Sequence, residues 1–130
     1  MDIGFVGASG LMGHGMAKNL LAKGHRLAIT VNRRREPVAD LLAAGAVEAA
    51  TPAELATRSD VVFVCVTGTP QVEAVCLGPQ GLIAGARPGT RIVDCSTSEP
   101  DSTRRLRALA AERGVEFVDA PLARTPVEAE

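Results

Sequence analysis

Near the amino terminus the sequence reads IGFVGASGLMG, residues 3–13. Its first part, Ile3–Val6, is a short apolar run that ends at a glycine, which is typical of a buried β-strand. From Leu11 to Lys23 apolar residues recur at helical spacing, and Gly24 follows as a helix stop. The stretch therefore predicts a strand, a tight glycine-rich turn and a helix in direct succession.

Glycines occur in this turn at the spacing G-x-x-G-x-x-G, one residue longer than the more common G-x-G-x-x-G. Gly7 permits the tight turn, Gly10 lets the backbone approach a pyrophosphate, and Gly13 allows the helix to pack against the sheet. The free N–H groups and partial positive charge of a helix amino terminus also attract phosphates. A purely structural turn is the alternative, because glycines end strands for local reasons too. The position between strand and helix favours a dinucleotide site made of Gly7, Ala8, Ser9, Gly10, Leu11, Met12 and Gly13.

Strand and helix patterns alternate along the rest of the chain. Apolar, strand-like runs cover residues 27–31, 61–66, 91–95 and 115–119. Helical patterns cover residues 38–44, 71–77 and 100–113, and a helix start with cap, proline and acid lies at 51–54. This alternation predicts an α/β fold: a doubly wound, mainly parallel sheet of the Rossmann type, with helices on both faces.

The end of the second predicted strand indicates which dinucleotide binds. A site for NAD usually has Asp or Glu there, to bond the ribose 2′-hydroxyl. This chain has Asn32, Arg33 and Arg34 instead, and arginine pairs well with a 2′-phosphate. The sequence therefore predicts NADP as the cofactor, with NAD as the second choice; a solvated basic turn is the alternative.

Two further strand ends are predicted to face the same crevice, because ligands bind at the carboxyl edge of such sheets. One carries Val66 and Thr67, and the other carries Ser96 and Thr97. Their small and hydroxyl side chains suit contacts to the ribose and nicotinamide, although ordinary turn chemistry would also explain them. His14 and His25 are interpreted as surface residues. Buried structural thiols are predicted at Cys65 and Cys95, because both lie in apolar strand-like runs, and the spacing of the three cysteines matches no metal or redox motif.

Composition excludes several other classes. A chain of 130 residues suits one domain, and 46% hydrophobic residues suffice for a core. A net charge of -1 without blocks of like charge argues against nucleic acid or a membrane surface as partner. With three Phe, no Tyr and no Trp, the chain has no platform for stacking bases. The lack of a signal sequence or an apolar span, together with the odd number of cysteines, predicts a cytoplasmic protein.

These motifs, taken together, resemble the amino-terminal domain of the β-hydroxyacid dehydrogenases (3-hydroxyisobutyrate dehydrogenase-like). The resemblance rests on the glycine-rich opening and on Asp60-Val61-Val62, Asp94-Cys95-Ser96-Thr97 and Asp119-Ala120-Pro121 in the family's order. It implies that residues 7–13 bind the pyrophosphate and Asn32 and Arg33 the adenosine ribose. It also implies that Val66, Thr67 and Thr97 line the cofactor site, and that Ser96 lies near the substrate.

The chain departs from the family pattern in two places. The glycine turn has one extra residue, and the family's Ser-Gly-Gly after Asp-Ala-Pro-Val is replaced by Ala123-Arg124-Thr125. The replacement is similar to the Gly-Arg-Thr segment of sulfolactaldehyde reductases. Arg124 and Thr125 would then bind the acidic group of a small oxo-acid or aldehyde, whereas a surface arginine is the alternative.

The resemblance implies an NADP-dependent oxidoreductase that transfers hydride between NADPH and such a substrate. Residues 1–120 would be the cofactor domain, and residues 121–130 a substrate-side segment leading to a helical domain outside this chain. The family's catalytic lysine would lie in that part, so no catalytic residue and no metal site is predicted here. The fragment alone would be inactive, and a homo-oligomer would form through the helical domain.

Other functions remain open at this point. A short-chain dehydrogenase is excluded for these residues because it needs a tyrosine, and the chain has none. A non-catalytic nucleotide-binding or regulatory module is the main alternative. A flavin or sugar-nucleotide site on the same fold is another, because the fold alone does not define the ligand.

Overall fold

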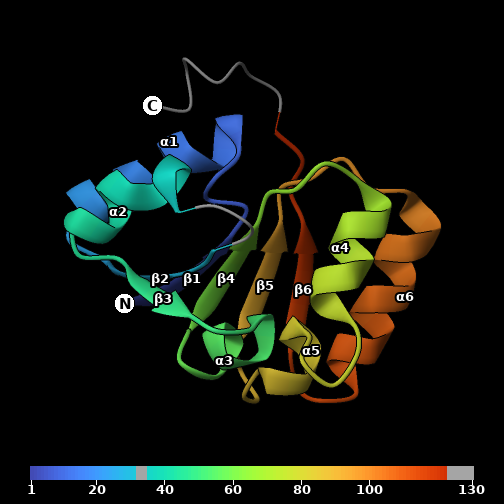
Figure 1. The fold of residues 1–130 in the computed structure, drawn as a ribbon. Helices are drawn as coiled ribbons and strands as arrows, with labels where there is room; N and C mark the ends of the chain where they lie inside the picture. Colours follow the sequence, from blue (N-terminus) through green and yellow to red (C-terminus); the bar gives the residue numbers. More distant parts are fainter. Residues whose placement is uncertain (32–34, 123–130) are drawn as a thin grey trace.

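The computed structural model describes residues 1–31 and 35–122. Within them the chain forms one six-stranded sheet with the strand order β3-β2-β1-β4-β5-β6, and every pairing is parallel (Figure 1). The strands are β1 Asp2–Val6, β2 Arg26–Thr30, β3 Val47–Ala49, β4 Val61–Val64, β5 Arg91–Asp94 and β6 Glu116–Asp119. The predicted α/β, doubly wound parallel fold is confirmed.

Helices cover both faces of the sheet. They are α1 Leu11–Ala22, α2 Ala39–Ala43, α3 Pro52–Thr57, α4 Thr69–Cys76, α5 Leu82–Gly85 and α6 Pro100–Ala111, with a short 3-10 helix, η1, at Glu36–Val38. In Figure 1, α1 and α2 lie on one side of the sheet, whereas α4, α5 and α6 lie on the other. The chain crosses between the faces after β3, so the strand order reverses between β1 and β4.

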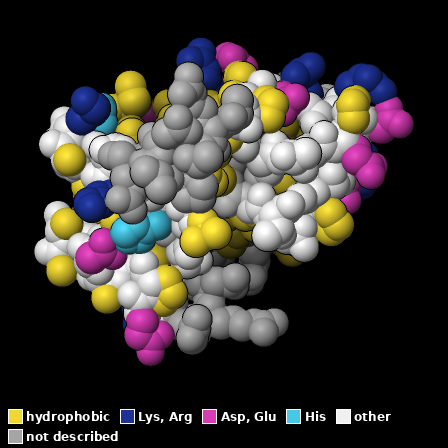
Figure 2. Space-filling view, turned by 90° about the horizontal axis from the view of Figure 1, so that it is seen from above, with side chains coloured by type: hydrophobic (Ala, Val, Ile, Leu, Met, Phe, Trp, Pro, Cys, Tyr) yellow, Lys and Arg dark blue, Asp and Glu magenta, His cyan; other side chains and the backbone are white. Residues whose placement is uncertain are grey.

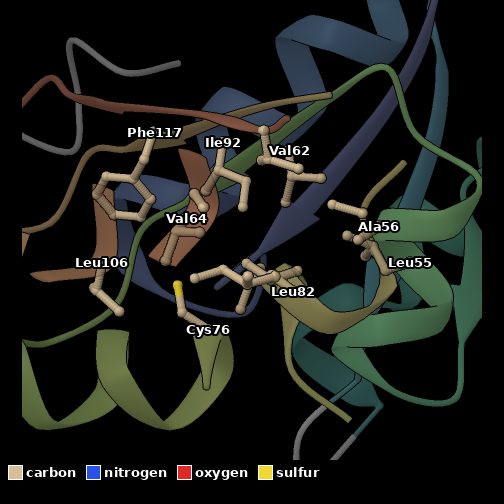
Figure 3. Close-up of a cluster of buried hydrophobic side chains, with 14 of the residues drawn as sticks. Leu55, Ala56, Val62, Val64, Cys76, Leu82, Ile92, Leu106 and Phe117 are labelled. Carbon is tan, nitrogen blue, oxygen red and sulfur yellow. The ribbon is translucent and has the colours of Figure 1, made fainter. Parts of the chain in front are cut away.

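A separate apolar core fills each face. The core under α1 and α2 contains Phe5 and Ile29 from the strands and Leu41 from α2. The core on the opposite face joins the β4, β5 and β6 side chains to α3, α4, α5 and α6 (Figure 3). The alternation along β4 explains this division: Val62 and Val64 are fully buried on one face, and Phe63 packs in the cluster on the other.

The helix start at residues 51–54 forms as the sequence predicts, with one difference. Thr51 caps α3, because its side-chain oxygen accepts a hydrogen bond from the Glu54 N–H at 3.1 Å. The Glu54 carboxylate accepts from the Ala50 N–H at 2.8 Å, one residue before the cap rather than at the cap itself. The reciprocal pair still satisfies two backbone donors at the helix end.

Three short elements were not predicted: β3, α5 and η1. They have three or four residues each, too few to show a period of either kind. Strands β4 and β5 also end before the apolar runs do, at Val64 and Asp94. No helix in the described part of the chain is long and apolar enough to cross a membrane.

Candidate nucleotide-binding site

The carboxyl edge of the sheet is hollowed where the strand order reverses. One cavity of about 440 Å³ is lined by Gly7, Ser9, Gly10, Leu11, Met12, Gly13, Cys65, Val66, Thr67 and Gln71. A second of about 310 Å³ shares Gly7, Ser9, Val66 and Gln71 with it and extends to Thr30 and Val31 at the end of β2. Figure 2 looks onto this edge of the sheet. Ligands of open α/β sheets bind in this kind of crevice.

Two of the glycines in the turn are required by the protein itself. Gly7 has a φ of 100°, and a Cβ there would lie 1.9 Å from the Cys65 carbonyl oxygen. A Cβ on Gly13 would lie 2.1 Å from the Gly7 carbonyl oxygen. Both distances are far below van der Waals contact, so any larger residue would push the turn away from β4 or from α1.

Gly10 differs from the other two. Its φ of -79° and ψ of 166° suit any residue, and a Cβ there would lie 3.3 Å from the Gly7 oxygen, its nearest neighbour. This contact is tight, but a shift of a few tenths of an ångström would relieve it, so the protein itself constrains Gly10 far less than Gly7 and Gly13. It borders the cavity at the amino terminus of α1, where a side chain would occupy space next to the first-turn N–H groups. This is the arrangement that close approach by a phosphate requires.

The remaining residues of the turn have distinct places. Ser9 and Leu11 are exposed at the cavity, Leu11 by 84%. Met12 lines the cavity and is partly exposed. Ala8 is completely buried in the core under α1, so only its backbone could contact a cofactor. The turn is held by the Gly10 N–H, which donates to the Gly7 carbonyl at 3.0 Å.

The arginine-rich segment cannot be placed, because Asn32, Arg33 and Arg34 lie outside the described residues. Arg35, the next arginine, forms an ion pair with Glu48 of β3. Nearby, His14 of α1 contacts the Asp40 carboxylate of α2 at 2.9 Å. This hydrogen bond holds the pKa of Asp40 below its usual value of 3.8. His14 thus links α1 to α2 on one face of the sheet.

The loop after β5 is held by a buried carboxylate. Asp94 is completely buried, and its oxygens accept hydrogen bonds from the Ser96 N–H at 2.9 Å and the Ser98 hydroxyl at 2.8 Å. The Ser96 oxygen accepts from the Val66 N–H at 2.9 Å, which ties the ends of β4 and β5 together. Ser96 is buried, whereas Thr97 is exposed and outside the lining of both cavities.

Among the predicted site residues that the structure describes, most but not all lie together. Val66 and Thr67 lie at the cavity with the glycine turn. The Ser96 oxygen instead accepts a hydrogen bond from the Val66 N–H. Arg124 and Thr125 lie outside the described residues. Sequence reasoning missed Gln71, which lines both cavities from the first turn of α4. Its position at the start of a helix that follows a strand end was the available signal.

The thiols differ in their surroundings. Cys95 is buried, as predicted, and so is Cys76, but Cys65, predicted to be buried too, is only partly buried and lines the cavity. Burial raises the pKa of Cys76 to about 12 and that of Cys95 to about 11. Burial and the nearby Asp94 also raise the pKa of Cys65. No group of His, Cys, Asp or Glu within the described ranges could hold a metal ion.

Comparisons with known proteins agree with this geometry. The chain is 41% identical over 123 residues to 2-hydroxy-3-oxopropionate reductase of Escherichia coli, covering 94% of the chain and 41% of that enzyme. It is 38% identical over 120 residues to the cytokine-like nuclear factor N-PAC of Xenopus tropicalis, covering 92% of the chain and 22% of that protein. The chain thus spans less than half the length of these relatives.

Solved structures of similar fold include oxidoreductases. Psf3 in complex with NADP+ and 2-OPP matches with a TM-score of 0.87 and 32% identity, over 96% of this chain and 44% of Psf3. Mycobacterium tuberculosis 3-hydroxyisobutyrate dehydrogenase with L-serine matches with a TM-score of 0.84 and 27% identity, over 97% of this chain and 42% of the enzyme.

The resemblance to amino-terminal domains of β-hydroxyacid dehydrogenases is confirmed by these matches. The family description that fits residues 2–130 is the NAD binding domain of 6-phosphogluconate dehydrogenase. The chain therefore belongs to this family of NAD-binding domains.

Proposed function

We propose that the chain is the NADP-binding domain of an oxidoreductase that transfers hydride between NADPH and a small oxo-acid or aldehyde. The observation that carries the proposal is the contrast between Gly10, where a Cβ would lie 3.3 Å from its nearest neighbour, and the much more crowded Gly7 and Gly13. Gly7 and Gly13 are explained by contacts within the protein, whereas Gly10 is explained by a group that approaches the cavity from outside. A pyrophosphate at the first turn of α1 is such a group.

The choice of NADP rests on the residues after β2. Thr30 and Val31 line the second cavity, so the segment that follows them begins at the cofactor crevice. Arg35 is already paired with Glu48, which leaves Arg33 and Arg34 as partners for a 2′-phosphate. Psf3, with a TM-score of 0.87, was solved with NADP+.

In this proposal the chain binds and orients the cofactor, and the cofactor supplies the hydride. The turn at residues 7–13 would hold the pyrophosphate, and Val66, Thr67 and Gln71 would border the ribose and nicotinamide. Thr97 would approach the nicotinamide end of the cofactor, and the segment from residue 121, with Arg124 and Thr125, would approach the substrate. The cofactor domain would comprise residues 1–120, and the proton donor would come from a helical domain outside these 130 residues.

The class of substrate follows from charge. Arg124 and Thr125 suit a carboxylate or sulfonate, and 2-hydroxy-3-oxopropionate reductase, which is 41% identical, has a small oxo-acid in its name. The proposed partners are therefore small anionic oxo-acids or aldehydes. The proposal includes a cytoplasmic protein that forms homo-oligomers and binds neither nucleic acid nor membranes.

A titration with Gly10→Ala tests the cofactor site. The change should weaken NADPH binding by about tenfold or more, because a methyl group would meet the phosphate. The free energy of unfolding should change by less than about 1 kcal/mol, since the backbone at Gly10 suits alanine. Nicotinamide fluorescence reports binding, and the chain has no Trp to interfere. Unchanged affinity in a folded Gly10→Ala chain would refute the site.

A second titration compares NADPH with NADH. NADPH should bind tighter by about tenfold or more, and Arg33→Ala with Arg34→Ala should remove the difference. Arg26→Ala is the matched control. Arg26 is the first residue of β2, at the end of the strand away from the two cavities, and it forms an ion pair with Asp2. Equal affinities in the unaltered chain would overturn the preference for NADP while leaving the dinucleotide site in place.

The similarity to N-PAC supports a second candidate, a nucleotide-binding module without catalysis. N-PAC is named as a nuclear factor, and the chain is 38% identical to it over 120 residues. The two candidates differ in turnover. A protein containing this domain that oxidises NADPH in the presence of short oxo-acids or aldehydes is an enzyme. One that binds NADPH and never consumes it across such a panel is a module.

A further inference from the structure

We propose that Cys65 and Cys95 form an oxidisable thiol pair beneath the nucleotide cavity, a modification site that closes to a disulfide. The two residues follow β4 and β5 directly, and they lie thirty residues apart in the sequence. Only the parallel sheet brings them together. The third thiol, Cys76 on α4, lies in the core of the opposite face and offers a matched control (Figure 3).

Strand register makes the two cysteines neighbours. Val64, the last residue of β4, pairs with Asp94, the last residue of β5, so Cys65 and Cys95 are the first residues after a matched pair. Hydrogen bonds on both sides keep the strands together there: the Cys95 N–H donates to the Val64 carbonyl at 2.7 Å, and the Val66 N–H donates to the Ser96 oxygen at 2.9 Å.

Their spacing suits a disulfide. Neighbouring strands lie about 4.8 Å apart, and disulfides join residues whose Cα atoms are about 4.4–6.8 Å apart. Side chains also alternate between the faces of a strand. Because Ile92 belongs to the core under α6, and Phe63 and Cys65 to the cluster under α1, Cys95 shares a face with Cys65. The electrostatic influence of Cys65 on Cys95 fits two neighbouring thiols.

Cys65 links this pair to the cavity. Cys65 lines the same cavity as the glycine turn. Gly7 packs so closely on the Cys65 carbonyl that a Cβ added to Gly7 would lie 1.9 Å from the carbonyl oxygen. A shift of Cys65 toward Cys95 would therefore displace part of the cavity lining, at Cys65 and Gly7. A bound dinucleotide would in turn shield Cys65 from reagents.

The oxidant in the proposed reaction is a low-molecular-weight disulfide, RSSR. The Cys65 thiolate, the more exposed of the two, attacks one sulfur, breaks the RSSR bond and releases one thiolate. Cys95 then loses its proton and attacks the Cys65 sulfur, which forms the Cys65–Cys95 bond and releases the second thiolate. Two protein thiols are oxidised, RSSR is reduced to two RSH, and the two protons end on the released thiols. Because both protein thiols have raised pKa values, closure should quicken as pH rises.

Peptide mapping with glutathione disulfide tests the pair. Trypsin leaves Cys65 and Cys76 together in residues 59–91 and Cys95 in residues 92–104, so Cys76→Ser makes the assignment unambiguous. We expect these two peptides to be joined in the folded Cys76→Ser chain, with the join abolished by Cys95→Ser. Circular dichroism checks that Cys76→Ser is folded. If it is not, the unaltered chain is oxidised instead, and alkylation of Cys76 there shows that Cys76 is not part of the disulfide. Joined peptides only after unfolding in urea would overturn the proposal.

The link to the cavity rests on the proposed cofactor site and is tested separately. NADPH at roughly ten times its Kd should slow closure by about tenfold, and the closed form should bind NADPH about tenfold more weakly. Joined peptides in a chain that never binds NADPH would support the thiol pair and refute the cofactor site. Binding of NADPH without any slowing of closure would refute the placement of the pair beneath the cavity.

Discussion

Two loops at the same edge of the sheet use their polar groups in opposite ways. The turn between β1 and α1 leaves Ser9, Gly10 and the first-turn N–H groups at an open cavity. The loop between β5 and α6 turns its groups inward, where Ser96 and Ser98 are bound to the buried Asp94. The first loop leaves its polar groups accessible at the cavity, whereas the second uses its polar groups to hold two strand ends in place. A residue's position at the carboxyl edge therefore does not by itself make it a contact residue.

The largest effect is expected from Gly7→Ala. The new Cβ would lie 1.9 Å from the Cys65 oxygen at a φ of 100°, so the turn has to leave β4. We expect a loss of more than about 3 kcal/mol in the free energy of unfolding, measured by urea titration. Gly24→Ala is the control, because Gly24 has a φ of 88° with nothing near its Cβ. Its expected cost is about 1 kcal/mol. Equal losses would show that packing against Cys65 is unimportant.

Asp94→Asn should have the next largest effect, and it tests the loop between β5 and α6. An amide can accept only part of what the carboxylate accepts from the Ser96 N–H and the Ser98 hydroxyl. A buried donor without a partner costs about 1–3 kcal/mol, which urea unfolding would detect. Thr97→Ala, in the same loop but exposed, should change stability by less than about 0.5 kcal/mol. A larger loss for Thr97→Ala than for Asp94→Asn would contradict this account of the loop.

The smallest effect is expected at the hydrogen bond between His14 of α1 and Asp40 of α2, and it depends on pH. The His14 hydrogen bond lowers the pKa of Asp40 below 3.8, so the ionised carboxylate stabilises the fold above that pH. This contribution is lost as pH falls through the lowered value. Asp40 is 56% exposed, so the contribution should stay under about 1 kcal/mol. Melting temperatures of the unaltered chain and Asp40→Asn should differ slightly at neutral pH and converge in acid. A constant difference would refute the assignment.

The predictable part of this protein is local or periodic. The glycine turn, the alternation of strands with helices, and the cap at Thr51 are visible in residues close together in the sequence. The doubly wound fold follows from that order, and the family follows from the resemblance that the glycine turn and the later motifs carry. Elements of three or four residues, such as β3 and α5, were missed because they are too short to show a period.

Assignments within the candidate site were harder to predict. Gln71 lines both cavities, yet its signal in the sequence was only its position at the start of a helix that follows a strand end. Ser96 has a hydroxyl at the right edge, but its buried oxygen accepts from Val66. Which way a side chain turns depends on the partner it meets, and such partners come from another strand.

By itself the sequence determined the class of fold, the helix amino terminus at the glycine turn and the arginines that follow β2. These features depend on φ, on hydrophobic period and on charge, which residues carry individually. Only the tertiary structure decided that β1 lies beside β4, that Gly7 packs on Cys65, and that Cys65 and Cys95 become neighbours. Those contacts join segments thirty or more residues apart, and they arise only when the parallel strands pair in register.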